Sequence, residues 1–118
     1  MDVDDARAAS DGGDPVVSTY SADPDMAELI QLFVGEMGQR IAALETCCRN
    51  REFSELKRIA HQLKGASGGY GFPSIGAAAG LLEEGVARAG SASDAASMGV
   101  IRKQVEDLVS MCRRVRAN

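Results

Sequence analysis

The C-terminal part of the chain holds the pattern that most restricts the fold. Apolar residues recur there at alternating intervals of three and four: Met98, Ile101, Val105, Leu108, Cys112 and Val115. This spacing puts them on one face of an α-helix and is typical of the seam of a helical bundle. A strand would need a period of two, and no stretch of the sequence shows one. We expect a helix from about residue 94 through residue 116.

Three earlier segments have the same helical spacing. The first should begin near residues 23–25, where an N-cap aspartate, a first-turn proline and a second aspartate coincide, and end near residue 49. The second follows the turn at residues 50–52 and stops in the glycine cluster at residues 68–71. The third opens at Pro73 and ends before Gly90. Four helices with short connections predict an all-α, antiparallel up-down-up-down four-helix bundle.

The N-terminal residues 1–15 differ from the rest because they are small, polar and rich in aspartate. Such a segment cannot bury enough apolar surface to offset its ordering entropy, so we expect a disordered acidic tail or linker. Val16, Val17 and Tyr20 follow, and could lie extended against the domain. The expected organisation is therefore a tail over residues 1–15 and a bundle over residues 16–118.

Composition excludes several classes of function. A length of 118 residues fits one domain, and a net charge of −4 argues against nucleic acid as a partner. No apolar run approaches the roughly 20 residues that cross a bilayer, and no secretory leader is visible, so a cytoplasmic protein is expected. Cys47, Cys48 and Cys112 lack the spacing of a zinc site or a disulfide framework, which predicts reduced thiols.

His61, the chain's single histidine, is the candidate functional residue. At 100° per residue it lies about 160° around the second helix from the apolar Leu63, so it should face solvent. Lys57 and Lys64 are its neighbours at i−4 and i+3. Such cations would stabilise a phosphoryl group on the ring. The sequence lacks the partners for a hydrolytic triad, a zinc site or a P-loop. We therefore expect a histidine that accepts a group from a partner with its own catalytic machinery.

The sequence around His61 resembles the signature of histidine-containing phosphotransfer (HPt) domains. The similar residues are Ala60-His61, Leu63-Lys64-Gly65-Ala66-Ser67 and Gly69-Tyr70-Gly71-Phe72. Residues 16–30 are similar to the lead-in of HPt modules at the ends of hybrid sensor kinases, and Leu82-Glu83 is similar to the family's next helix. The family fold is a four-helix bundle.

The resemblance implies a phosphorelay in which His61 Nε2 takes a phosphoryl group from a receiver-domain aspartate and passes it to another. By position, Lys64 stabilises the phosphate and Gly65 permits the receiver to approach. Gln62 and Ser67 are candidates for partner contacts or for orienting the ring. The Mg²⁺ that the transfer needs belongs to the receiver, so no cofactor of the domain itself is implied. The protein would be a phosphoryl carrier rather than an enzyme.

Helix geometry adds Lys57, Gly68 and Gly69 to the candidate partner surface. For the two glycines, a docking surface and a simple helix end are both open interpretations. Receiver domains are the expected partners, without nucleic acid or membrane contact by the domain. It would act as a monomer, either free in the cytoplasm or tethered within a membrane-bound hybrid kinase.

Three other assignments compete with this one. A kinase dimerisation domain also exposes a histidine, but there an acidic residue follows it and a proline interrupts the helix; here Gln62 follows His61 and the helix holds no proline. The N-terminal HPt module of a chemotaxis-type kinase remains open. So does a non-catalytic helical bundle that binds a receiver, for which replacement of His61 would leave function intact.

Overall fold

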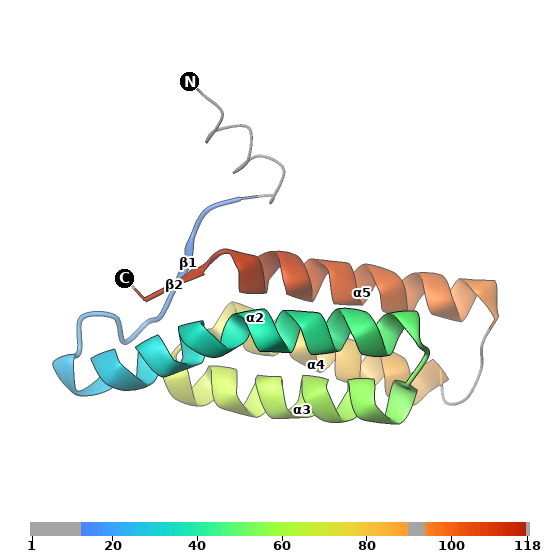
Figure 1. The fold of residues 1–118 in the computed structure, drawn as a ribbon, viewed down its shortest axis with the longest axis horizontal. Coiled ribbons are helices and arrows are strands. Elements are labelled where there is room, and N and C mark those ends of the chain that lie inside the picture. The colour runs from blue at the N-terminus through green and yellow to red at the C-terminus, as the bar shows by residue number, and fades with distance from the viewer. Residues whose placement is uncertain (1–12, 90–93, 118) are drawn as a thin grey trace, which may run out of the picture.

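The computed structural model describes residues 13–89 and 94–117, which form mostly helix. The four long helices are α2 (Ala27–Arg49), α3 (Phe53–Tyr70), α4 (Pro73–Ala89) and α5 (Ala95–Arg113). In Figure 1 they lie along the long axis of the molecule, and the colour runs in opposite directions along consecutive helices. α2 packs on α3 and α5, and α4 packs on the same two helices. The prediction of a protein dominated by four helices is confirmed.

Polar caps and glycine define the helix ends. Before α2, the 3₁₀ helix η1 (Pro24–Met26) is capped by Asp23, whose Oδ1 accepts a hydrogen bond from the Asp25 amide at 2.9 Å. The Asp94 carboxylate accepts one from the Ser97 amide at 2.7 Å at the start of α5. At the end of α3, Gly71 has a φ of 86°. A side chain there would also overlap the Ser18 hydroxyl, so only glycine fits without displacement.

The core is built from the apolar stripes that the sequence shows on each helix. Phe33 of α2 anchors one end of it, where its ring stacks on Phe72 at 4.9 Å between centroids and packs against Tyr70 at 5.3 Å. The fully buried large side chains come from all four helices and from the connection after α3: Phe33, Phe72, Ile30, Leu44, Leu56, Leu63, Ile75, Leu82, Ile101 and Leu108. Burial of these stripes holds the bundle together.

The segment before η1 is fastened to the bundle by backbone pairing. Strand β1 (Val16–Val17) lies parallel to strand β2 (Val115–Arg116), with Val16 opposite Val115. The Ser18 hydroxyl donates to the Tyr70 carbonyl at 2.6 Å, which ties the same segment to the end of α3. The expectation of an extended segment against the domain is confirmed for Val16 and Val17, but it is wrong for Tyr20, which lies in a turn and is exposed. The predicted acidic tail falls mostly on residues 1–12, outside the described residues.

The predicted end of the last helix was wrong. α5 ends at Arg113, and Val115 belongs to β2 instead of continuing the helical seam. Val115 is nevertheless buried, because its pairing with β1 covers it. The position of Val115 fits the helical spacing of the preceding apolar residues, but an apolar residue is equally common in a short strand. Sequence spacing alone therefore does not show whether Val115 belongs to a helix or to a strand.

The three cysteines are free thiols, as expected from their spacing; Cys47 and Cys112 are buried and Cys48 is partly buried. Among the described helices, none combines the length and apolar character that a membrane span requires.

Candidate functional site

His61 stands on the outer face of α3, with 70% of its side chain exposed. The adjacent residue Ala60 and the residue two positions on, Leu63, are both fully buried. The helical period therefore turns the imidazole away from the core, as predicted.

Glu83 of α4 holds the ring from one side. Its Oε2 lies 2.8 Å from His61 Nδ1, and only 19% of the glutamate side chain is exposed. An ionised carboxylate can only accept hydrogen bonds, so Nδ1 donates to it. In the neutral imidazole this leaves Nε2 without a proton, and its lone pair is available as a nucleophile.

Lys64 shares the same carboxylate. Its Nζ lies 3.8 Å from Glu83 Oε1, and about half of the lysine side chain is exposed. The aliphatic stem passes over Gly80 of α4, where an added Cβ would lie 3.5 Å from Lys64 Cδ. The α3–α4 contact thus brings a nucleophilic nitrogen, a cation and a carboxylate into one cluster.

The predicted cation Lys57 also lies beside His61. Both residues line a shallow surface depression of about 360 Å³, together with Glu83, Ser54 and Arg58. Arg58 is paired with Glu55 one turn away. Among the residues that the structure describes, none forms an ion pair with Lys57, so its charge is directed at solvent beside the ring.

Three exposed glycines follow His61 on α3. A Cβ built on Gly65, Gly68 or Gly69 would meet nothing within 4 Å outside the helix itself. The helix continues past them to Tyr70 and is stopped by Gly71. The predicted helix end within the glycine cluster is confirmed, but Gly71 and not Gly68 or Gly69 terminates the helix. Neither internal packing nor a left-handed backbone requires glycine at Gly65, Gly68 and Gly69.

The comparison with protein-family models matches residues 28–116 to the Hpt domain. The chain belongs to the Hpt domain family. Comparisons with curated proteins and with solved structures gave no match. Hpt domains are phosphocarrier modules of two-component signalling, and they interact with receiver domains of response regulators. The resemblance stated from the sequence around His61 is thereby confirmed.

Two candidate residues of this Hpt domain lie away from the ring. Ser67 is fully buried, and its hydroxyl donates to the Leu63 carbonyl at 2.6 Å. The expectation that Ser67 contacts a partner or orients the ring is wrong, because the inward face of α3 keeps it from both. Gln62 is exposed on the α2 side of α3, where it lines a hollow with Gln39 and Arg40.

The residue that orients the ring is Glu83, which sequence reasoning did not single out. Its hydrogen bond to His61 depends on the axial register between α3 and α4. The spacing of residues within one helix does not determine the register between two helices. The sequence contains only an indirect indication that Glu83 lies near His61. Gly76 and Gly80 mark the face of α4 that approaches Lys64, and Glu83 follows Gly80 by one turn on that face.

Proposed function

We propose that His61 Nε2 accepts a phosphoryl group from the aspartyl phosphate of a receiver domain and passes it to an aspartate of another receiver, or returns it. The observation that carries this proposal is the contact between Glu83 and His61 Nδ1 on an imidazole that is 70% exposed. One ring nitrogen is held by the protein and the other is left for the partner.

In the transfer step, the Nε2 lone pair attacks phosphorus and forms an N–P bond. The P–O bond to the receiver aspartate breaks, and that carboxylate leaves with the electron pair. Nδ1 keeps its proton, so the ring gains positive charge as the bond forms. The Glu83 carboxylate is 2.8 Å from Nδ1 and stabilises this charge more in the transition state than in the ground state.

Lys64 supplies positive charge for the phosphoryl oxygens. Its ammonium is half exposed and is only loosely paired with Glu83 at 3.8 Å, so it can turn toward a phosphate on the neighbouring ring. Lys57 adds a second cation among the residues that line the depression beside His61. We infer that the Mg²⁺ of the reaction is held by the receiver, as the family resemblance implies.

The three exposed glycines of α3 form the surface on which a receiver approaches the ring. Since nothing inside the fold occupies the space above Gly65, Gly68 and Gly69, that space is open to a partner's side chains. Gln62 would contact the partner from the α2 side. The domain would act as a monomeric carrier, used stoichiometrically, as a free protein or as a module of a hybrid kinase.

The test is transfer of labelled phosphate to the protein from a receiver domain phosphorylated on its aspartate, with Mg²⁺ present, for the wild type and His61→Gln. An acid-labile, base-stable label on the wild type alone is expected. Equal labelling of the variant would place the acceptor elsewhere. Receivers that bind both proteins without transferring the label would favour the non-catalytic bundle.

A further inference from the structure

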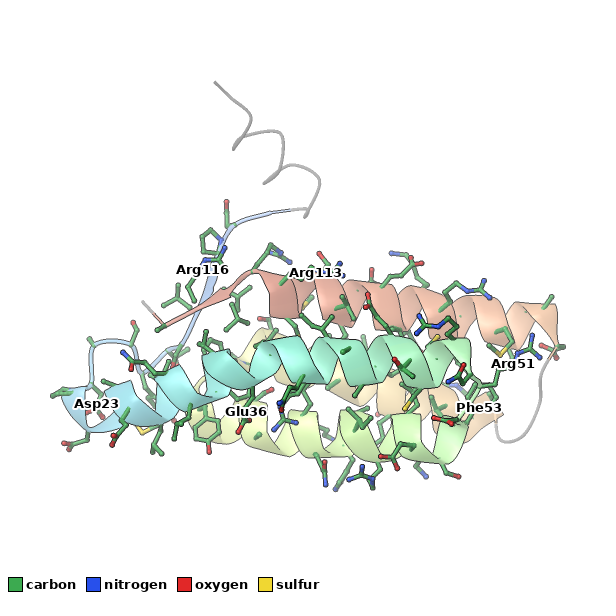
Figure 2. The ribbon with its side chains drawn as sticks, viewed as in Figure 1. Asp23, Glu36, Arg51, Phe53, Arg113 and Arg116 are labelled. Atoms are coloured by element: carbon green, nitrogen blue, oxygen red, sulfur yellow. The ribbon has the colours of Figure 1, made fainter. Side chains whose placement is uncertain are left out.

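Another hollow lies between α2 and α5, whereas His61 and Glu83 belong to α3 and α4. It has a volume of about 550 Å³ and is here named the α2/α5 groove. Figure 2 shows two of its arginines far apart along the bundle, Arg113 on α5 and Arg51 at the turn after α2. Its lining residues are Glu45, Cys48, Arg49, Arg51, Met98, Arg102, Val105, Glu106, Val109 and Arg113.

The α2/α5 groove is positively charged in an acidic protein. Four arginines and two glutamates line it, while the chain as a whole carries a net charge of −4. Arg113 is paired with Glu45 at 3.1 Å. Within residues 13–89 and 94–117, Arg51 and Arg102 form no ion pair. The groove therefore holds guanidinium groups that are available to an anionic partner.

The backbone at Arg51 supports a role for its side chain. Arg51 has a φ of 57° in the turn after α2, where its amide donates to the Cys48 carbonyl at 3.2 Å. Glycine is the usual residue at such a left-handed helix end. An arginine there directs a long cation into the groove. Guanidinium groups bind carboxylates in a two-pronged geometry, which favours carboxylates as the ligand.

We propose that the α2/α5 groove binds the acidic residues 1–12 of the same chain. That segment carries four aspartates and one arginine. It joins the described chain at Gly13, beside Asp14, whose carbonyl accepts a hydrogen bond from Arg114 at 2.8 Å. Arg114 is the neighbour of Arg113, which lines the groove.

The segment is long enough to follow the groove. Twelve extended residues reach at most ~40 Å. The groove follows α5 from Met98 to Arg113, which is ~22 Å at the helical rise per residue. Binding there would draw the aspartates away from Lys57 and Lys64 and so leave the face around His61 to the receiver. This proposal does not depend on the transfer chemistry.

The test compares ¹H–¹⁵N NMR spectra of the full chain with those of a variant in which Asp2, Asp4, Asp5 and Asp11 are replaced by asparagine. Loss of the four charges should shift the side-chain Nε–Hε signals of Arg51 and Arg102 and the backbone amides that line the groove. About 0.5 M NaCl should shift the same wild-type signals, because it screens exposed charges. In an Arg51→Gln/Arg102→Gln background, the four asparagines should cause much smaller shifts.

Groove signals that do not respond to the four asparagines would overturn the proposal. So would shifts confined to Lys57, Lys64 and their neighbours, since the acidic segment would then bind the phosphotransfer face. Shifts that grow with protein concentration would assign the bound segment to a second copy and would likewise contradict binding within one chain.

Discussion

The carboxylate of Glu83 lies between the two groups that the proposed transfer needs. Its Oε2 is 2.8 Å from His61 Nδ1 and its Oε1 is 3.8 Å from Lys64 Nζ. One mostly buried side chain of α4 thus sets the tautomer of His61, the proposed acceptor on α3, and is loosely paired with the adjacent Lys64. The chemistry of the site depends on the packing of two helices as well as on the motif in one of them.

Glu83→Gln should slow phosphoryl transfer to His61 about tenfold, which corresponds to about 1.4 kcal/mol. The amide keeps the shape of the side chain but carries no negative charge for the positive ring. The rate of label transfer measures the effect, and the ¹⁵N shifts of the imidazole report the tautomer. Glu84→Gln, on the exposed neighbouring residue, is the control. An unchanged rate together with an unchanged tautomer would show that Glu83 has no positioning role.

Lys64→Gln should also reduce the transfer rate by about tenfold, because a charge-assisted contact to the phosphoryl oxygens is lost. Lys57→Gln should have a smaller effect, since Lys64 forms an ion pair with Glu83 and Lys57 forms none with it. Transfer rates measured in parallel for both variants test whether the loss is larger for Lys64→Gln than for Lys57→Gln. A larger loss for Lys57→Gln would reverse the roles assigned to the two cations.

Gly65→Ala separates stability from function. The new methyl group would meet nothing inside the fold, so the higher helix propensity of alanine should raise the free energy of unfolding by up to about 1 kcal/mol. Phosphoryl transfer should nevertheless slow, because the methyl group would stand on the surface over which we propose that the receiver approaches.

Gly38→Ala is the matched control for Gly65→Ala. Gly38 is an exposed glycine of α2 with the same open surroundings. Its replacement should give a similar gain in stability, measured by denaturant unfolding, with no change in transfer. Normal transfer by Gly65→Ala would remove the argument for docking over the glycines.

Alkaline pH should destabilise the fold through Cys112. Burial raises the pKa of this thiol from its ordinary value of 9.0 to about 11. Below pH 9 the thiol is protonated in both states; above it the unfolded chain releases the proton first, so stability falls as pH rises to about 11. The loss is about 2–3 kcal/mol. Unfolding curves from pH 8 to 11 should be flatter for Cys112→Ala than for the wild type, and parallel curves would contradict this assignment.

The sequence was sufficient to predict features that depend on the periodicity of a single helix. The stripe through Leu56, Ala60 and Leu63 predicts both the helix and the outward direction of His61, because one period fixes both. Features that depend on contacts between two segments could not be predicted from the sequence. Neither the β1–β2 pairing at Val115 nor the reach of Glu83 to His61 follows from spacing within one element, since each needs a register between elements.

For Ser67, the resemblance to the family motif led to a wrong prediction. Its place in the motif made it a candidate for partner contact, although it continues the apolar stripe of α3. The Ser67 hydroxyl donates a hydrogen bond to the Leu63 carbonyl, so it can be buried at little cost in free energy. The helical periodicity therefore predicted the position of Ser67 better than the motif did.

The most direct test of the account is the site of the N–P bond. The ¹⁵N-labelled full chain, phosphorylated by a receiver domain with Mg²⁺, would be examined by ¹⁵N–³¹P correlation NMR. Phosphorus should be coupled to His61 Nε2, and Nδ1 should retain the proton that it donates to Glu83. Phosphorus bonded to Nδ1, or to any residue other than His61, would contradict this prediction.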